Sequence, residues 1–300
     1  MKIHENRASD ENRQDAEPES SHAVRGGLCQ SVAGGARAAD FVARYRFADV
    51  VLFTDSDAAR EVRTVRTVPI ARLDSVNAYS TFMLKELHRH IRTPWALVAQ
   101  WDGYVIDPRG WHREFFEYDY IGAPWSWHTD GYTVGNGGFS LRSKRLLDML
   151  ASPEFPEIHG APEDEVICRI HRPALEARGI RFAPVELAQL FSYENSIPDF
   201  PTFGFHSASN LWRHVNDAEL ADLVAKLDPR ALRSPEMRRL LTTFYQFRKF
   251  DCLRVLYLRN REFWTHDEIA AQLTQIYVAP DVVALCAATC AALWDQKDFA

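Results

Sequence analysis

Hydrophobic and polar positions divide the chain into three parts. Residues 1–37 are polar at first and then rich in Gly and Ala, which predicts a disordered N-terminus without a convincing strand. Residues 38–215 alternate short apolar runs with amphipathic stretches. Residues 216–300 contain almost no glycine, and their apolar residues recur at helical spacing, so we expect an all-helical C-terminal extension. Most of its apolar stripes are expected to be core. A protein partner or self-association through these helices is the other interpretation.

The middle part has the pattern of an α/β domain. Short apolar runs predict strands at 50–53, 65–70 and 95–99, and an amphipathic helix is expected at 77–91. Helices and strands that alternate at short spacing are typical of an α/β layered domain with a mixed, mostly parallel sheet flanked by helices. Further strands are expected at 120–121, 138–141 and 180–183, and further helices at 111–118, 143–150 and 162–178, whereas the segment 203–206 is expected to belong to a ligand cleft.

A ligand cleft is expected in the stretch from Gln100 to Arg142, which is too rich in Trp, Asp and Gly to be only core. A buried strand ends there in Gln100, Trp101 and Asp102. Because ligands of such sheets bind at the carboxyl ends of strands, Trp101 and Asp102 are candidates for contact with a ligand.

Aromatic residues and glycines of the same stretch suit a sugar ligand. Aromatic faces commonly pack on sugar rings, which makes Trp125 and Trp127 candidates, although core tryptophans are the alternative. The motif Gly-Asn-Gly-Gly at 135–138 can bring backbone amides close to a sugar or a diphosphate. A glycine-rich turn between strands is the alternative for this motif.

Three further features are candidates for a divalent cation site. Asp102 can hold Mg²⁺ or Mn²⁺ beside a diphosphate, because hard oxygen ligands suit these ions, whereas a turn Asp that caps a loop is equally compatible. Asp55 and Asp57 have the Asp-x-Asp spacing of many nucleotide-sugar enzymes. The loop after them, which begins Ala-Ala-Arg, shows no further sign of a binding site, so we interpret them as turn residues. His206 can be a second metal ligand as a neutral imidazole, although a lone His is usually structural.

An acidic motif, Glu163-Asp164-Glu165, lies where a helix is expected to begin. Carboxylates in a first helical turn suit the helix dipole, which explains one of them more easily than three. A general base must lie within hydrogen-bond reach of the hydroxyl that it deprotonates. A junction of loop and helix that faces a cleft is a suitable place, so the motif is either a base site or a helix terminus.

Composition and charge argue against several classes of protein. The chain has 300 residues, of which 46% are hydrophobic and 25% charged, and its net charge of −6 argues against a nucleic-acid binder. We expect no membrane span, because no apolar run is long enough, and no secretory signal, so a cytoplasmic location is expected. The five cysteines are scattered, which favours reduced thiols.

Six segments together resemble a known family. They are FADVVLFTD, QWDGYVIDP, YDYIGAPW, VGNGGFSLRS, PEDEVIC and FGFH, and they lie in order between Phe47 and Asn210. They resemble a largely bacterial family that is classed as a domain of unknown function and regarded as glycosyltransferase-like. That family is similar to the nucleotide-diphospho-sugar transferases of the GT-A fold.

The resemblance implies a metal-dependent, inverting transfer of a sugar from a nucleotide-sugar donor to a saccharide or another hydroxyl acceptor. Under it, Asp102 and His206 would bind Mn²⁺ or Mg²⁺, and Asp164 would be the catalytic base, with Glu163 orienting the acceptor. The donor would contact Gly137 and Gly138. From the residues themselves, we add Trp101, Trp125, Trp127 and Asn136 as candidates for substrate contact.

Two departures from the family pattern leave a second function open. Gln100 stands where a second metal-binding acid is expected. The opening strand that should carry the nucleotide pocket is replaced by a Gly/Ala-rich stretch, residues 24–39. A defective first strand would favour the alternative function, a catalytically inactive module that binds a carbohydrate or a partner on the same fold.

Overall fold

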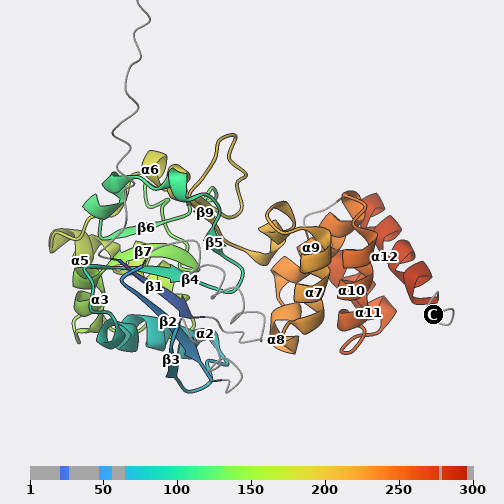
Figure 1. Cartoon of the computed structure of the whole chain (residues 1–300), viewed down its shortest axis with the longest axis horizontal. Coiled ribbons are helices and arrows are strands. Elements are labelled where there is room, and N and C mark those ends of the chain that lie inside the picture. The colour runs from blue at the N-terminus through green and yellow to red at the C-terminus, as the bar shows by residue number, and fades with distance from the viewer. Residues whose placement is uncertain (1–20, 27–46, 56–64, 277–278, 296–300) are drawn as a thin grey trace, which may run out of the picture.

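The structure is a computed structural model, and it describes residues 21–26, 47–55, 65–276 and 279–295. An α/β unit and a bundle of helices lie side by side (Figure 1). The expected mixed α/β architecture is therefore confirmed, and every described element after Asn216 is a helix. Among the described residues, no helix is both long enough and apolar enough to cross a membrane.

The main sheet has six strands in the order β3-β2-β1-β4-β7-β6. Strands β3, β2, β1 and β4 pair in parallel, whereas β7 runs antiparallel to both of its neighbours. The parallel part of the sheet is thus confined to these four strands. The bounds are β1 Ser21–Gly26, β2 Asp49–Thr54, β3 Arg66–Pro69, β4 Trp95–Ala99, β6 Tyr120–Gly122 and β7 Phe139–Ser143.

Strand β1 corrects the expectation that nothing before residue 38 forms a strand. It lies at the centre of the sheet, where its register pairs Val24 with both Val51 of β2 and Val98 of β4. Its six residues hold too short an apolar run to stand out from the polar segment before it. Pairing between two buried neighbours decides its conformation, because strand formation depends strongly on tertiary context. The defect that would have favoured an inactive module is therefore absent from residues 21–26.

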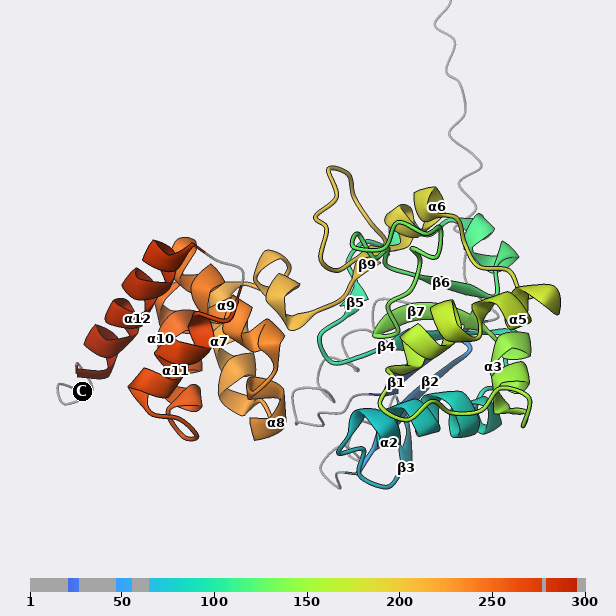
Figure 2. The ribbon, with the colours of Figure 1, turned by 180° about the vertical axis from the view of Figure 1, so that it is seen from behind.

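Helical segments cover both faces of this sheet. Side chains alternate along a strand, so Val51 and Phe53 point to one face and Val50 and Leu52 to the other. The first face packs against the segment 76–90 and the second against α6 (Val185–Phe191) and the turn at Arg113–Glu117. Seen from behind, α2 and α6 lie on opposite sides of the strands (Figure 2).

The expected helix at 77–91 is present, with Ser75 as its N-cap, but only its start is regular α-helix. It passes from α2 (Val76–Thr81) through a wider turn at Phe82–Glu86 to a tighter one at Leu87–His90. The helix expected at 143–150 is confirmed as α3 (Lys144–Ala151), capped by Ser143. The expected strand at 180–183 is reduced to a single bridge between Tyr120 and Phe182.

The expected helix at 162–178 is interrupted. It consists of α4 (Glu163–Glu165), a wider turn at Val166–Ile170 and α5 (Arg172–Ala177). Gly179 follows with a φ of +81°, as expected for a glycine that ends a helix.

A small second sheet connects the α/β unit to the helices. Its strands are β5 (Tyr104–Val105), β9 (Gly204–Phe205) and β8 (Ser192–Tyr193), with β9 in the middle. Phe205 is completely buried and belongs to the same hydrophobic cluster as the C-terminal helices. These helices are α7 Asp217–Lys226, α8 Pro229–Leu232, α9 Pro235–Gln246, α10 Phe250–Asn260, α11 His266–Leu273 and α12 Pro280–Asp295.

Candidate functional site

A pocket of about 380 Å³ lies beyond the carboxyl end of β4, where parallel α/β sheets bind ligands. We call it the cleft. Segments far apart in the sequence line it, and most of the candidate residues are among them. The lining includes Tyr79, Gln100, Trp125, Trp127, Asn136, Gly138, Glu163, Asp164, Glu194 and His206.

His206 lies at the floor of the cleft, directly after β9, and its ring faces acidic groups on two sides. Its Nε2 is 3.4 Å from Oδ1 of Asp102 and 3.2 Å from Oε1 of Gln100, and its Nδ1 is 3.0 Å from Oε1 of Glu194. Because a carboxylate lies beside each ring nitrogen, an imidazolium would direct one N–H to Glu194 and the other toward Asp102; Nδ2 of Asn136 also lies 3.1 Å from Nδ1. The expected approach of Asp102 and His206 is therefore present.

Asp102 and Gln100 are held so that one oxygen of each faces His206. Oδ2 of Asp102 accepts a hydrogen bond from the backbone amide of Ala208, whereas its buried Oδ1 accepts none. The amide nitrogen of Gln100 donates to the hydroxyl of Tyr79 at 2.8 Å, which turns Oε1 toward the imidazole. Burial disfavours the charged imidazolium, but the two carboxylates outweigh it and hold the pKa of His206 well above its ordinary value.

These atoms fit a divalent cation. His206 Nε2 lies 3.4 Å from Asp102 Oδ1 and 3.2 Å from Gln100 Oε1, separations that are compatible with bonds of roughly 2.0–2.3 Å to one shared ion. A Cβ on Gly138 would lie 2.0 Å from Nε2, so only glycine keeps this edge of the ring clear. No group of three His, Cys, Asp or Glu side chains in the described ranges has a metal-binding arrangement, and Gln100 would have to be the third ligand.

Asp164 projects from the start of α4 to the rim of the cleft. Its Oδ2 accepts from the backbone amide of Gly137 at 3.0 Å, and its Oδ1 accepts from the amide of Glu165 at 2.9 Å. The carboxylate is partly exposed and lines the cleft, so a hydroxyl of a ligand can reach it. Two fixed hydrogen bonds orient it, which is what a general base requires.

Glu163 has contacts of another kind. It is buried, and its Oε1 accepts from the guanidinium of the fully buried Arg142 at 2.8 Å. Arg142 also donates to the carbonyl oxygen of Gly137 at 3.2 Å, so the ion pair fixes the turn that bonds Asp164. These contacts do not fit the expected orientation of an acceptor by Glu163. They make Glu163 a support for its neighbour Asp164.

The motif at 135–138 owes its composition to close packing. A Cβ on Gly137 would lie 1.9 Å from Oε1 of Glu163, and Asn136 adopts a positive φ of 59°, which Asn tolerates better than most residues. Asn136 and Gly138 line the cleft, whereas Gly137 is not among its lining residues. The glycines thus bring the turn close to Glu163 and His206, a role that the sequence does not reveal.

The tryptophans divide between cleft and core. Trp125 and Trp127 both line the cleft; Trp125 is buried, and its ring fills the space where Gly135 would have a Cβ, whereas Trp127 is 52% exposed. Trp101 points elsewhere and packs against the hydrophobic cluster of the C-terminal helices. Trp101 is therefore not among the residues that line the cleft, and its expected substrate contact stays a prediction.

Glu194 and Tyr79 are the site residues that the sequence analysis missed. Glu194 lies in the segment SYENS, which matches no acidic motif, and Tyr79 has the helical spacing of a core residue. Only the fold brings them to His206 and Gln100. Of the Asp-x-Asp pair, Asp55 forms an ion pair with Arg72 at 3.6 Å, and Asp57 lies outside the described residues.

Comparisons with known proteins give a family and several solved structures. The family described as "Protein of unknown function (DUF5672)" matches residues 62–206, and no curated protein matches. The galactosyltransferase LgtC, solved with donor and acceptor sugar analogs, is 11% identical, with a TM-score of 0.40 over 63% of this chain and 87% of its own. Its mutant Q189E is 10% identical, with a TM-score of 0.41 over 73% and 99% of the two chains.

The bifunctional IspDF from Campylobacter jejuni is also similar, at 9% identity and a TM-score of 0.37 over 55% of this chain. This chain spans about half the length of IspDF, 49%. At these identities nothing about activity passes from the solved structures to this chain.

Proposed function

We propose that this protein is a glycosyltransferase that moves a sugar from a nucleotide-sugar donor to a hydroxyl acceptor with inversion. The observation that carries the proposal is the cleft itself. It places a partly exposed, doubly hydrogen-bonded carboxylate, Asp164, in one hollow with the imidazole of His206 and with two tryptophans. The complete parallel strands β3, β2, β1 and β4 beside it support a working nucleotide site.

In the proposed reaction, Asp164 accepts the proton of the acceptor hydroxyl as the hydroxyl oxygen forms a bond with the anomeric carbon of the donor. The bond between that carbon and the diphosphate oxygen breaks, and its electron pair leaves with the nucleoside diphosphate. The attacking oxygen and the leaving group occupy opposite sides of the carbon, so its configuration inverts. Arg142 and Glu163 act through the turn at Gly137, which holds Asp164 in place.

Asp102, His206 and Gln100 would hold Mn²⁺ or Mg²⁺. When bound, such an ion supplies positive charge that neutralises the leaving diphosphate. Binding of the ion would require His206 to release its proton from Nε2, and Glu194 would keep the other proton on Nδ1.

The test is turnover of a panel of nucleotide sugars with Mn²⁺ by the native protein and by Asp164→Asn. This substitution keeps the size of the side chain but removes the base, so turnover should fall roughly 10²–10⁴-fold with donor affinity nearly unchanged. Asp148→Asn, an exposed change in α3, is the matched control and should keep native turnover.

An Asp164→Asn protein as active as the native one would refute the base assignment. A native protein that binds a nucleotide sugar but neither transfers nor hydrolyses it would instead favour the non-catalytic module. A purely structural Asp164 predicts a loss of roughly 0.5–2 kcal/mol in the free energy of unfolding without a specific kinetic defect, and thermal denaturation distinguishes this case.

A further inference from the structure

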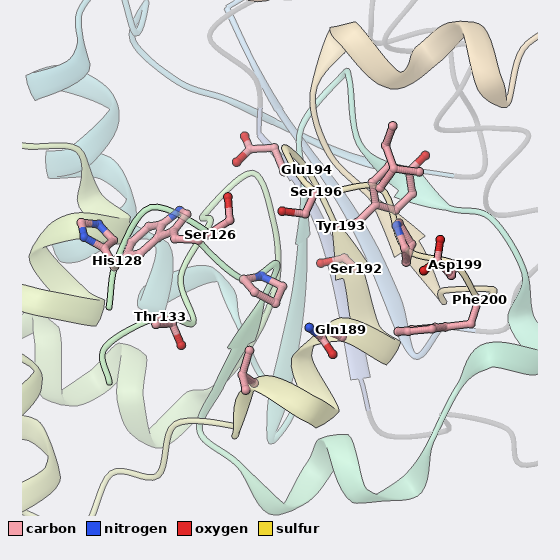
Figure 3. A pocket seen from close by; sticks show the side chains of 15 residues that line it. Ser126, His128, Thr133, Gln189, Ser192, Tyr193, Glu194, Ser196, Asp199 and Phe200 are labelled. Carbon is pink, nitrogen blue, oxygen red and sulfur yellow. The ribbon is translucent and has the colours of Figure 1, made fainter. Parts of the chain in front are cut away.

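A second pocket, of about 460 Å³, lies next to the cleft (Figure 3). Its walls come from the loop at 124–133, from α6, and from β8 with the loop that follows it as far as Phe200. Its volume is within the roughly 300–1,000 Å³ of small-molecule sites. Trp125 and Glu194 line both hollows, so they form the wall that the two share.

The walls of this pocket suit a neutral ligand that has both an apolar face and hydroxyl groups. Proline, valine, isoleucine and aromatic side chains form most of the surface, and serine, threonine and glutamine side chains are set among them. The lining contains two carboxylates, Glu194 and Asp199, and no lysine or arginine; its one histidine, His128, has Nε2 3.6 Å from Oε1 of Glu165. A phosphate or carboxylate group would therefore meet two carboxylates, while the one histidine is already beside Glu165.

Two lining residues, Ser192 and His128, have a buried polar side-chain atom without a hydrogen-bond partner in the structure. Ser192 is completely buried, lines the pocket, and its Oγ has no hydrogen-bond partner in the structure. Leaving such a buried hydroxyl unpaired costs roughly 1–3 kcal/mol, and a ligand hydroxyl would remove that cost. Figure 3 shows the hydroxyls of Ser126, Ser192 and Ser196 around the same hollow.

We propose that this pocket binds the acceptor, and that the acceptor is a neutral glycoside with an apolar aglycone. The inference rests on the proposed glycosyltransferase function. The apolar part would lie between Val185 and Phe200, and the sugar would face the shared wall. Its reacting hydroxyl would pass Trp125 and Glu194 to reach Asp164 in the cleft, where its proton is transferred while the oxygen bonds to the anomeric carbon.

Calorimetry on the full-length protein without donor tests the pocket independently of turnover. The probes are phenyl β-glycosides of glucose, galactose and N-acetylglucosamine, together with the corresponding 6-phosphates. We expect at least one neutral glycoside to bind, and its phosphate to bind at least 10-fold more weakly. Ser126→Phe, an exposed position that lines the pocket, should weaken binding at least 10-fold by filling the space.

Gln189→Ala removes a lining amide and should weaken binding roughly 3–10-fold. Glu186→Ala lies on the same helix outside the lining and is the matched control, which should bind as the native protein does. Thermal denaturation of each variant shows whether it is folded. Equal binding of neutral and phosphorylated probes, native affinity in folded Ser126→Phe, or no binding of any neutral probe overturns the proposal.

Two further outcomes separate this inference from the proposed function. If a neutral glycoside binds in the pocket but no donor is ever turned over, the proposed function fails and the pocket remains a glycoside site. If donors are hydrolysed and the glycoside binds but is never glycosylated, the acceptor role is wrong while the glycosyltransferase-like chemistry stands.

Discussion

The cleft and the C-terminal helices differ in the kinds of side chain that they bury. The cleft is surrounded by buried charged and polar side chains that lie beside one another, such as Arg142 with Glu163 at 2.8 Å and Asp102 with His206 at 3.4 Å. In the helices, the described buried polar residues after Asn216 are only Thr242 and Asn260, and the remaining core is apolar. Buried charge is costly and is retained where it positions a group, whereas apolar packing only needs area. Among the described residues, the buried ion pairs therefore lie in the α/β unit, around the proposed site, and the core of the helices lacks them.

The two regions nevertheless share one strand. In β9, Phe205 packs in the hydrophobic cluster of the helices, and the next residue, His206, faces the cleft. Successive residues of an extended chain point to opposite sides, so one backbone segment serves both regions. Packing of Phe205 against the helices therefore helps to fix the position of His206 relative to Asp102 and Gln100.

The largest expected effect comes from removing the helices. A chain that ends at Asn216 would expose Phe205, Leu211 and Tyr193, which are buried in the intact protein. Because exposed apolar surface of this extent promotes aggregation, we expect an insoluble or strongly destabilised product. Solubility and thermal denaturation measure this. A truncated protein as soluble and stable as the full chain would show that the two regions are independent.

A point substitution sharpens the same comparison. Leu256→Ala, in the core of α10, should lower the free energy of unfolding by roughly 2–5 kcal/mol, whereas Leu285→Ala, at a position that is 55% exposed, should change it little. One cooperative transition in Leu256→Ala, followed by both tryptophan fluorescence and helical circular dichroism, is expected if β9 couples the regions. Two separate transitions would break that coupling.

The next effect concerns the cleft. Glu194→Gln should lower affinity for Mn²⁺ roughly 10–100-fold, because carboxylates that orient a metal-binding histidine typically contribute that much. An amide can donate to Nδ1 of His206 as well as accept from it, so the tautomer is no longer fixed. Calorimetric titration of Mn²⁺ without donor measures the effect. Glu186→Gln is the control, and equal affinities in the two variants would remove Glu194 from the proposed site.

Sequence alone predicted the two regions unequally. Periodicity sufficed for the helices and for β2 and β4, because apolar side chains repeat there with a regular spacing. The family resemblance brought Asp102, Asp164 and His206 forward, and the structure places the first and last of these within 3.4 Å. Strand β1, Glu194 and the burial of Glu163 could not be predicted, since each depends on neighbours that are distant in sequence.

A smaller effect is expected in the pH dependence of stability, at the contact between His214 and Tyr193 where the two regions join. His214 donates to or accepts from the hydroxyl of Tyr193 at 2.6 Å, and burial together with Arg213 lowers the pKa of His214 to about 4. The unfolded chain, with a pKa near 6.5 at this residue, binds more protons between pH 4 and 6.5 than the folded chain does. Stability should therefore fall as pH decreases through this window, by roughly 1–2 kcal/mol from this residue.

His214→Gln should lessen that pH dependence, because glutamine does not titrate. Denaturant unfolding of the native protein and the variant at pH 7, 5.5 and 4.5 isolates the contribution, since the other groups that titrate in this range are common to both. Parallel curves for the two proteins would mean that His214 does not contribute.

The smallest expected effect is that of Asp55→Ala on the affinity for Mn²⁺, because Asp55 lies outside the proposed metal site. Asp55 follows β2, and β1 lies between β2 and β4, so two strand spacings of roughly 4.8 Å each separate its strand from the one that precedes Asp102. Its carboxylate pairs with Arg72 at 3.6 Å, and a pair this exposed contributes at most about 1 kcal/mol. Asp55→Ala, alone or with Asp57→Ala, should thus keep native affinity for Mn²⁺, whereas Asp102→Ala should lose it. Titration of Mn²⁺ into these variants decides between the two acidic motifs.

Affinity lost in the double variant but kept in Asp102→Ala would move the metal site from β4 to β2, and with it the region where the donor diphosphate binds.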